Sequence, residues 1–298
     1  MDFDVIIIGG SYAGLSAALA LGRAKRNILI VDAGKPCNRQ TPHAHNFLTH
    51  DGDAPAKISA AAKAEVLKYP TVKFIDGTVN AANKTAEGFS VMINESLSYS
   101  ARKLLVATGL KDVFPNIKGF AECWGITVIH CPYCHGYEVS GEKIALLMNG
   151  DIAFEMAKNL NHWNKDLTLL TNGKSHLTAE QTEKLKSKSI EIIETEIKEI
   201  AHANGKLTNV IFADGTKLNL KAIYAKADVE QHVDFHDQLG FELTEFKTIK
   251  VDGQQQTTVK GVYAAGDCTT LMRSLSVITA AGTMAAVMMN KEMISEDF

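Results

Sequence analysis

Apolar and polar positions at the start of the chain follow the pattern of a strand, a turn and a helix. Val5–Ile8 is a β-branched apolar run, which predicts a buried strand, and it ends at the glycine-containing turn Gly9–Gly14. Apolar residues then recur at helical spacing from Leu15 to Arg23, and the apolar run Asn27–Val31 predicts a second buried strand that ends at Asp32. Strand, glycine turn, helix, strand and terminal acid together predict a βαβ unit.

The first turn has the residue types of a dinucleotide-binding loop, with a plain βαβ turn as the alternative. Gly9 permits a tight turn, Gly14 lets helix and strand pack closely, and free N–H groups at the helix N-terminus favour a pyrophosphate. Asp32 is placed to accept hydrogen bonds from a ribose. Ser11 stands where the pattern usually has its second glycine, which crowds the approach of the phosphates. The predicted site comprises Gly9, Gly10, Ser11, Ala13, Gly14 and Asp32.

Later stretches repeat parts of this pattern. Lys103–Gly109 predicts a strand that ends in small residues, and Gly261–Asp267 has the same shape before an alanine-, glycine- and methionine-rich helix, Ser276–Met289. Between them, Lys143–Met148 begins a second βαβ unit. We therefore predict an α/β fold with two Rossmann-like (three-layer β/β/α) dinucleotide-binding domains, the second inserted in the first. Residues 1–112 and 244–298 would form the first domain, and residues 113–243 the second.

A CxxC pair flanked by histidines, His130, Cys131, Cys134 and His135, lies just before the second βαβ unit. Two cysteines at this spacing can close a disulfide whose potential and thiolate pKa are set by the neighbouring groups, which indicates redox chemistry. Zinc is the competing interpretation, but a structural zinc site needs four ligands, and the remaining cysteines stand alone. We therefore predict a redox pair with His135 and His130 as functional neighbours, and no metal site.

Composition narrows the choice of partners. The chain has 298 residues, of which 46% are hydrophobic and 22% charged, and its net charge of −3 gives no general attraction to nucleic acid or anionic membranes. No apolar run approaches the ~20 residues of a membrane span, and the first residues carry no positively charged signal region. Five cysteines do not form a disulfide framework. We expect a cytoplasmic protein that acts on a small molecule or another protein.

In the order and spacing of its motifs the chain resembles the low-molecular-weight thioredoxin reductase family of flavoproteins. The matching stretches are Gly9–Gly14 with Asp32, Ala107–Gly109, the CxxC pair, and Gly261–Asp267 followed by Thr279–Gly282. The resemblance implies FAD bound by both ends of the chain, and it implies a homodimer. The cofactor residues that it adds are Ala107, Thr108, Gly109, Gly266, Asp267, Ser276 and Val277, with Asp267 at the pyrophosphate and ribitol.

The resemblance also implies roles for the redox pair. A Cys131–Cys134 disulfide would reach the flavin, with Cys134 as the flavin-facing sulfur and Cys131 as the one that exchanges with substrate. Where the family commonly has a proton-handling aspartate, this chain has His135, which titrates near neutrality and can take a proton from a dithiol or give one to a thiolate. Glu138 is placed to orient this imidazole and raise its basicity.

The inserted domain departs from the family at three places that bind NADPH. Its first turn, Met148–Ala153, lacks a glycine cluster and puts a methionine where a phosphate needs bare backbone. The next strand ends in Thr171–Lys174, with one lysine instead of an arginine cluster for the 2′-phosphate. Ala227–Gln231 is acidic where the family has a glycine- and proline-containing segment. Together these departures predict poor or lost NADPH binding.

Two routes remain open for the electrons. The run from His130 to Glu138 also resembles the dithiol oxidases that close disulfides in gliotoxin- and holomycin-type metabolites, in which a small dithiol reduces the pair and oxygen reoxidises the flavin. In the other route, electrons come weakly from NADPH or from a protein such as ferredoxin, and leave to a thioredoxin-like disulfide; the exchange itself is reversible. We favour an FAD-dependent thiol–disulfide oxidoreductase with weak or no NADPH use. An NADPH-dependent thioredoxin reductase and a flavin-bearing redox sensor are the alternatives.

Overall fold

The computed structural model describes all 298 residues, and these form two compact units. The first unit consists of Met1–Arg39, Asn46–Asp112 and Val229–Phe298, and the second of Gln40–His45 and Val113–Asp228. The chain thus leaves the first unit at the expected residue 112 but returns at 229 rather than at 244. It returns early because three apolar side chains beyond residue 229, Phe235, Leu239 and Phe241, are buried in the core of the first unit.

The short segment Gln40–His45 belongs to the second unit, although its position in the sequence suggested the first. The Gln40 side-chain amide donates to the carbonyl oxygens of Ala121 and Trp124, at 3.3 and 3.0 Å. Such long-range side-chain hydrogen bonds leave no trace in the hydrophobic pattern. The segment therefore brings its own side chains, His45 among them, into the second unit.

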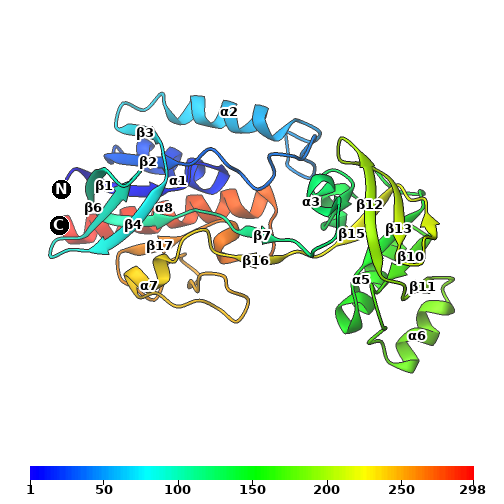
Figure 1. Ribbon diagram of the computed structural model, residues 1–298. Helices are drawn as coiled ribbons and strands as arrows, with labels where there is room; N and C mark the ends of the chain where they lie inside the picture. Colours follow the sequence, from blue (N-terminus) through cyan, green and yellow to red (C-terminus); the bar gives the residue numbers. More distant parts are fainter. The chain divides into compact units, whose positions relative to one another are not determined.

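The first unit is a sheet covered by helices (Figure 1). Its elements are β1 (Phe3–Ile8), α1 (Tyr12–Arg23), β2 (Ile28–Asp32), α2 (Pro55–Val66), β3 (Val72–Asp76), β4 (Val79–Lys84), β5 (Phe89–Ile93), β6 (Leu97–Val106), α7 (Phe235–Leu239), β17 (Val262–Ala264), the 3-10 turn η1 (Asp267–Thr269) and α8 (Leu275–Asp297). The seven strands run in the order β3-β2-β1-β6-β5-β4, with β17 also paired to β6. β1 pairs in parallel with β2 and β6, as the apolar runs predicted, whereas β5 is antiparallel to β4 and β6.

The second unit contains a parallel sheet in the order β11-β10-β9-β15-β8 and a three-stranded antiparallel sheet in the order β12-β13-β14. Its elements are α3 (Phe120–Cys123), β8 (Val128–Ile129), α4 (Pro132–His135), β9 (Ile144–Leu147), α5 (Gly150–Trp163), β10 (Leu167–Leu170), α6 (Ala179–Lys186), β11 (Glu191–Ile193), β12 (Ile197–Ala203), β13 (Lys206–Phe212), β14 (Lys217–Leu218) and β15 (Ala222–Ala225). β7 (Lys111–Val113) and β16 (Asp228–Glu230) lie where the chain passes between the units, and they pair with each other. The predicted α/β class is confirmed. No helix has both the length and the apolar character that crossing a membrane requires.

Small residues let α1 and α8 of the first unit run side by side (Figure 1). A Cβ added to Gly282 of α8 would overlap the carbonyl oxygen of Ala13 on α1, and a Cβ added to Gly14 would overlap the carbonyl oxygen of Gly9. The Ser16 hydroxyl donates to the carbonyl oxygen of Thr279 at 2.7 Å, which joins the same two helices. The turn that precedes α1 is therefore held against β1 on one side and α8 on the other.

We predict that Gly282→Ala destabilises the first unit, because the added methyl group has to push α8 away from the Ala13 carbonyl. Overpacking of this kind costs about 1–3 kcal/mol. The matched control is Gly253→Ala, where a Cβ meets nothing within 4 Å and the backbone φ is not positive. Thermal unfolding of both variants checks the prediction, and equal midpoints for the two would contradict the close packing.

Candidate active site

The predicted cofactor residues of the first unit come together where its parallel strands end. A Cβ added to Gly9 would overlap the carbonyl oxygen of Ala107, which directly follows β6 and precedes Thr108 and Gly109. A Cβ added to Gly266 would lie 2.9 Å from the Cβ of Ala13. Three distant stretches of the chain thus meet around the turn before α1. Ser276 and Val277 lie in the first turn of α8, and the Ser276 hydroxyl donates to the Asn46 carbonyl oxygen at 3.3 Å.

The N-terminus of α1 is open to an anion. Its N-cap residue, Ser11, makes no side-chain capping hydrogen bond, and the first turn of the helix holds no acidic residue. The first N–H groups of a helix have no acceptor within the helix and carry partial positive charge, so they favour a phosphate. Beside this turn, Asp32 accepts hydrogen bonds from the backbone N–H groups of Gly10 and Gly34, at 3.0 and 3.3 Å. These bonds hold the carboxylate at the end of β2.

Asp267 is the second carboxylate of this surface, and only 7% of it is exposed. Its Oδ2 accepts hydrogen bonds from Arg273 Nε at 3.2 Å and from the Cys37 thiol at 3.4 Å, and Arg273 also pairs with Asp112 at 2.5 Å. Its Oδ1 is buried and has no hydrogen-bond partner within the protein. An unpartnered buried acceptor costs free energy, and a ligand hydroxyl would satisfy it. The residues present therefore fit FAD.

The sequence did not show which residues would contact Asp267. Arg273 and Asp112 are isolated charged residues outside any motif, and Cys37 is a single cysteine in a loop. Cys37 is exposed as a residue, but the protein groups packed around its thiol desolvate it, and together with the negative charge of Asp267 this raises the pKa of the thiol to about 11. A thiol with so high a pKa is almost entirely protonated at neutral pH, so Cys37 is a poor nucleophile. Cys268 is fully buried, and burial raises its pKa to about 12.

In the second unit, Cys131 and Cys134 are bonded to each other as a disulfide, the arrangement that a redox pair requires, with their Cα atoms 5.3 Å apart. The helical turn α4 produces this geometry, since the backbone N–H groups of Cys134 and His135 both donate to the Cys131 carbonyl oxygen at 3.2 Å. Gly136 ends the turn. A Cβ there would overlap the Pro132 carbonyl oxygen and lie 3.1 Å from the Trp163 ring, so glycine is required.

The two histidines beside the disulfide have different surroundings. The His130 ring stacks on Trp124, with ring centres 5.4 Å apart. His135 is partly buried, and burial lowers its pKa; the negative charge of Glu138 opposes this shift, and His45 adds to it. Glu138 Oε1 lies 3.5 Å from His45 Nε2. The structure therefore pairs Glu138 with His45, and both charges act on His135. The sequence did not point to His45, because it lies far away in the chain.

The second βα turn, before α5, is closed by the side chain of Asn149. Asn149 Oδ1 accepts hydrogen bonds from the backbone N–H groups of Gly150 and His176, both at 2.8 Å. Asn149 Nδ2 donates to the carbonyl oxygens of Lys174 and Thr171, at 2.9 and 3.4 Å. Asp151 adds a negative charge to the first turn of α5. This helix N-terminus is thus already supplied with an acceptor and an acid, whereas that of α1 has neither.

The sequence suggested that the Met148 side chain stands where a phosphate would approach the backbone. Its side chain packs against the hydrophobic core of the second unit, and the neighbouring Asn149 occupies the turn instead. Thr171, at the end of β10, donates its hydroxyl to the carbonyl oxygens of Gly173 and Ile193, at 2.6 and 3.3 Å. The strand end that would receive a 2′-phosphate therefore offers only the Lys174 side chain as a cation.

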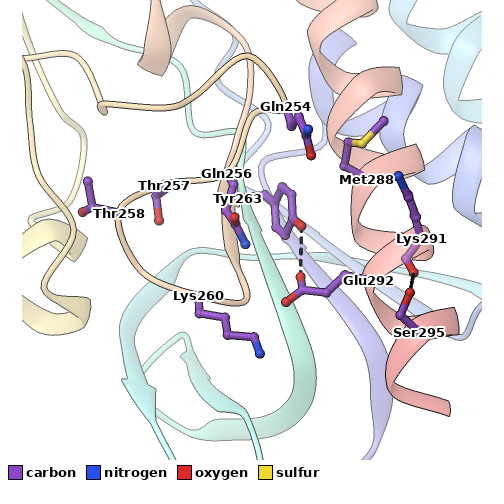
Figure 2. A pocket seen from close by; sticks show the side chains of 10 residues that line it. All are labelled: Gln254, Gln256, Thr257, Thr258, Lys260, Tyr263, Met288, Lys291, Glu292 and Ser295. Carbon is purple, nitrogen blue, oxygen red and sulfur yellow. Dashed lines mark hydrogen bonds between the residues drawn. The ribbon is translucent and has the colours of Figure 1, made fainter. Parts of the chain in front are cut away.

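An open cavity of about 570 Å³ lies elsewhere in the first unit, between the loop 254–260 and the last turns of α8 (Figure 2). Tyr263 and Glu292 meet there through a hydrogen bond of 2.9 Å. None of the predicted cofactor or redox residues lines this cavity. It is therefore separate from the candidate site.

The chain matches a described protein family and several known proteins along nearly its whole length. The sequence pattern of the family described as pyridine nucleotide-disulphide oxidoreductase matches residues 3–285. The chain is 32% identical to thioredoxin reductase tcpT of Claviceps purpurea, over 98% of this chain and 95% of that protein. It is 30% identical to thioredoxin reductase sirT of Leptosphaeria maculans, over 99% and 95%. Among solved structures, an oxidoreductase from Agrobacterium tumefaciens is 38% identical, with a TM-score of 0.93 and 99% of each chain covered.

We predict that Asp267→Ala weakens flavin binding, because it removes the unpartnered buried acceptor and leaves Arg273 without one of its carboxylates. Loss of one hydrogen bond to a charged group corresponds to a loss of affinity of about tenfold or more. The measurement is the FAD content of the purified protein and its affinity for added FAD. Asp237→Ala, at a side chain that is 78% exposed, is the control and should keep full flavin content.

Proposed function

Since the chain belongs to the pyridine nucleotide-disulphide oxidoreductase family and is a thioredoxin reductase-like flavin disulfide oxidoreductase, we propose that it oxidises small dithiols without using NADPH. FAD, when bound, supplies a two-electron acceptor for the Cys131–Cys134 pair and a centre that dioxygen can reoxidise to give hydrogen peroxide. The substrate class is a small dithiol, whose product is the corresponding disulfide.

The contrast between the two βα turns carries this proposal. At α1 the N-cap side chain makes no capping bond and the first turn has no acid, so the turn suits a phosphate. At α5 the Asn149 side chain already fills the turn, and Asp151 would repel a phosphate. Binding NADPH there would require breaking the hydrogen bonds of Asn149 and placing phosphates beside a carboxylate. This supports one dinucleotide per chain, held by the first unit.

The exchange at the disulfide follows from the chain's own groups. A substrate thiol gives its proton to His135, and the resulting thiolate attacks Cys131 Sγ. The Cys131–Cys134 bond breaks, and Cys134 leaves as a thiolate. The second substrate thiol gives its proton to solvent, and its thiolate attacks the substrate sulfur of the mixed disulfide, which releases the oxidised substrate and Cys131 as a thiolate. Two electrons now reside on the cysteine pair, and two protons have left the substrate.

Burial suits His135 to the first step. It lowers the pKa of His135, so the imidazole is neutral at physiological pH and can accept a proton. The Glu138 charge opposes this shift and stabilises the imidazolium once it forms. A neutral base with a nearby carboxylate favours taking protons from a dithiol.

An NADPH-dependent thioredoxin reductase is the second candidate, because the matching family is described by its pyridine nucleotide and the fungal relatives are named thioredoxin reductases. Electrons would then pass through the same disulfide in the opposite direction, to a thioredoxin-like protein. A redox sensor would carry the same flavin and disulfide but turn over slowly. Only the source of the electrons and the rate of turnover separate these functions.

We predict that a small dithiol such as dithiothreitol bleaches the flavin absorbance of the oxygen-free protein, and that NADPH at micromolar concentrations does not. Admitting air should restore the colour and produce one peroxide for each disulfide formed. Cys134→Ser should abolish bleaching by the dithiol, because the exchange no longer has a disulfide to attack. The readout is the flavin spectrum under anaerobic conditions.

The matched control for this experiment is Cys123→Ala, which removes a cysteine outside both the redox pair and the predicted flavin site and should bleach at the wild-type rate. Rapid bleaching by NADPH would establish the reductase and overturn the proposal. Bleaching by dithiol without sustained turnover in air would establish the sensor.

A further inference from the structure

Glu138 pairs with one imidazole, that of His45, and its charge acts on a second imidazole, that of His135. Its Oε1 lies 3.5 Å from Nε2 of His45. The side chains of His45 and Glu138 are 20% and 39% exposed, so this group of residues reaches the surface of the unit. His135 is also partly buried and directly follows Cys134 in the chain. Glu138 and His45 thus lie between the region of the redox pair and solvent.

The segment that carries His45 is anchored in the second unit. Gln40 donates two hydrogen bonds to the carbonyl oxygens of Ala121 and Trp124. Thr41 packs closely on Gly125: a Cβ added to Gly125 would lie 2.8 Å from the hydroxyl oxygen of Thr41. His45 is therefore held beside Glu138 by its own segment.

The charged and titratable groups around His135 act in opposite directions. Burial lowers its pKa, the Glu138 charge raises it, and His45 lowers it again, because a positive charge on one imidazole disfavours a positive charge on the other. Tyr224 on β15 also feels Glu138: its residue is 1% exposed, its hydroxyl has no hydrogen-bond partner, and burial followed by the Glu138 charge raises its pKa.

We propose that His45 is a positioning residue for the thiol–disulfide exchange: it holds Glu138 and shares this carboxylate with His135, so that the proton taken from a substrate thiol can leave through His45 to solvent. The identity of the substrate thiol rests on the function proposed above. The arrangement of His45, Glu138 and His135 is the same whichever molecule supplies the thiol. For each turnover His135 takes a proton from a thiol and passes it to the Glu138 carboxylate, and Glu138 passes it to His45. The cluster returns to its starting charge when His45 releases this proton to water.

The test follows the ionisation of His135 directly. In holoenzyme labelled with carbon-13 at the histidine Cε1 positions, the His135 signal is assigned through its loss in His135→Gln and then titrated. In His45→Gln the midpoint should rise by about one pH unit, because the competing imidazole is gone, and in Glu138→Gln it should fall by about one unit. Opposite shifts from two neighbouring substitutions are not expected from a loss of structure. His176→Gln removes an exposed histidine of the same unit and should leave the midpoint unchanged.

A second readout is the pH dependence of the single exchange step, followed as reduction of the Cys131–Cys134 disulfide by a dithiol. The step requires neutral His135, so its rate rises with pH through the pKa of His135. At a pH below this pKa, His45→Gln should be about tenfold slower than wild type and Glu138→Gln faster, which matches shifts of about one unit in each direction.

The two readouts separate this inference from the proposed function. If no dithiol reduces the protein, the oxidase function fails, and the histidine titration still reports on the cluster. If His45→Gln leaves the His135 midpoint unchanged or lowers it, the shared carboxylate is disproved, whatever the substrate is. Circular dichroism of each variant establishes that it is folded before it is titrated.

Discussion

The N-terminus of a helix has N–H groups without acceptors, and what satisfies them decides what each unit of this protein can bind. The chain builds the same strand–turn–helix arrangement twice. At α1 no side chain caps these N–H groups, so they are available to a ligand. At α5 the side-chain oxygen and nitrogen of Asn149 form hydrogen bonds that close the turn. Two related folds therefore have different uses. The first unit has the features of a dinucleotide site, and the second presents a disulfide.

Close backbone contacts shape the turn before α1 in the first unit, and charges act on the histidines near the disulfide in the second unit. Around the first turn, glycines at 9, 14, 266 and 282 allow strands and helices to approach at distances that a side chain would prevent. The buried Asp267 is held by Arg273 and keeps one oxygen unpartnered. Around the disulfide, the carboxylate of Glu138 pairs with His45, and its charge acts on the partly buried His135. We propose that the first arrangement binds the flavin and that the second handles protons.

Much of the fold was predictable because it is local. Apolar runs predicted β1, β2 and β9, and glycines marked the turns, so the α/β class and the first crossing between the units followed from the sequence. The return at Val229 and the placement of Gln40–His45 did not, since both depend on contacts between residues far apart in the chain. For the same reason Arg273 and His45 were missed. Met148 was misjudged because a pattern of residues does not show which neighbour turns inward. The homodimer remains a prediction.

The claim that the second unit has given up its nucleotide is tested most directly by calorimetric titration of NADPH into the oxidised, flavin-loaded protein. Because Asn149 closes the turn, we expect no saturable binding of NADPH or of NADP⁺ at micromolar concentrations. Saturable binding in the micromolar range, lost when Lys174 is replaced by Ala, would show that Asn149 yields to a phosphate and would contradict the account.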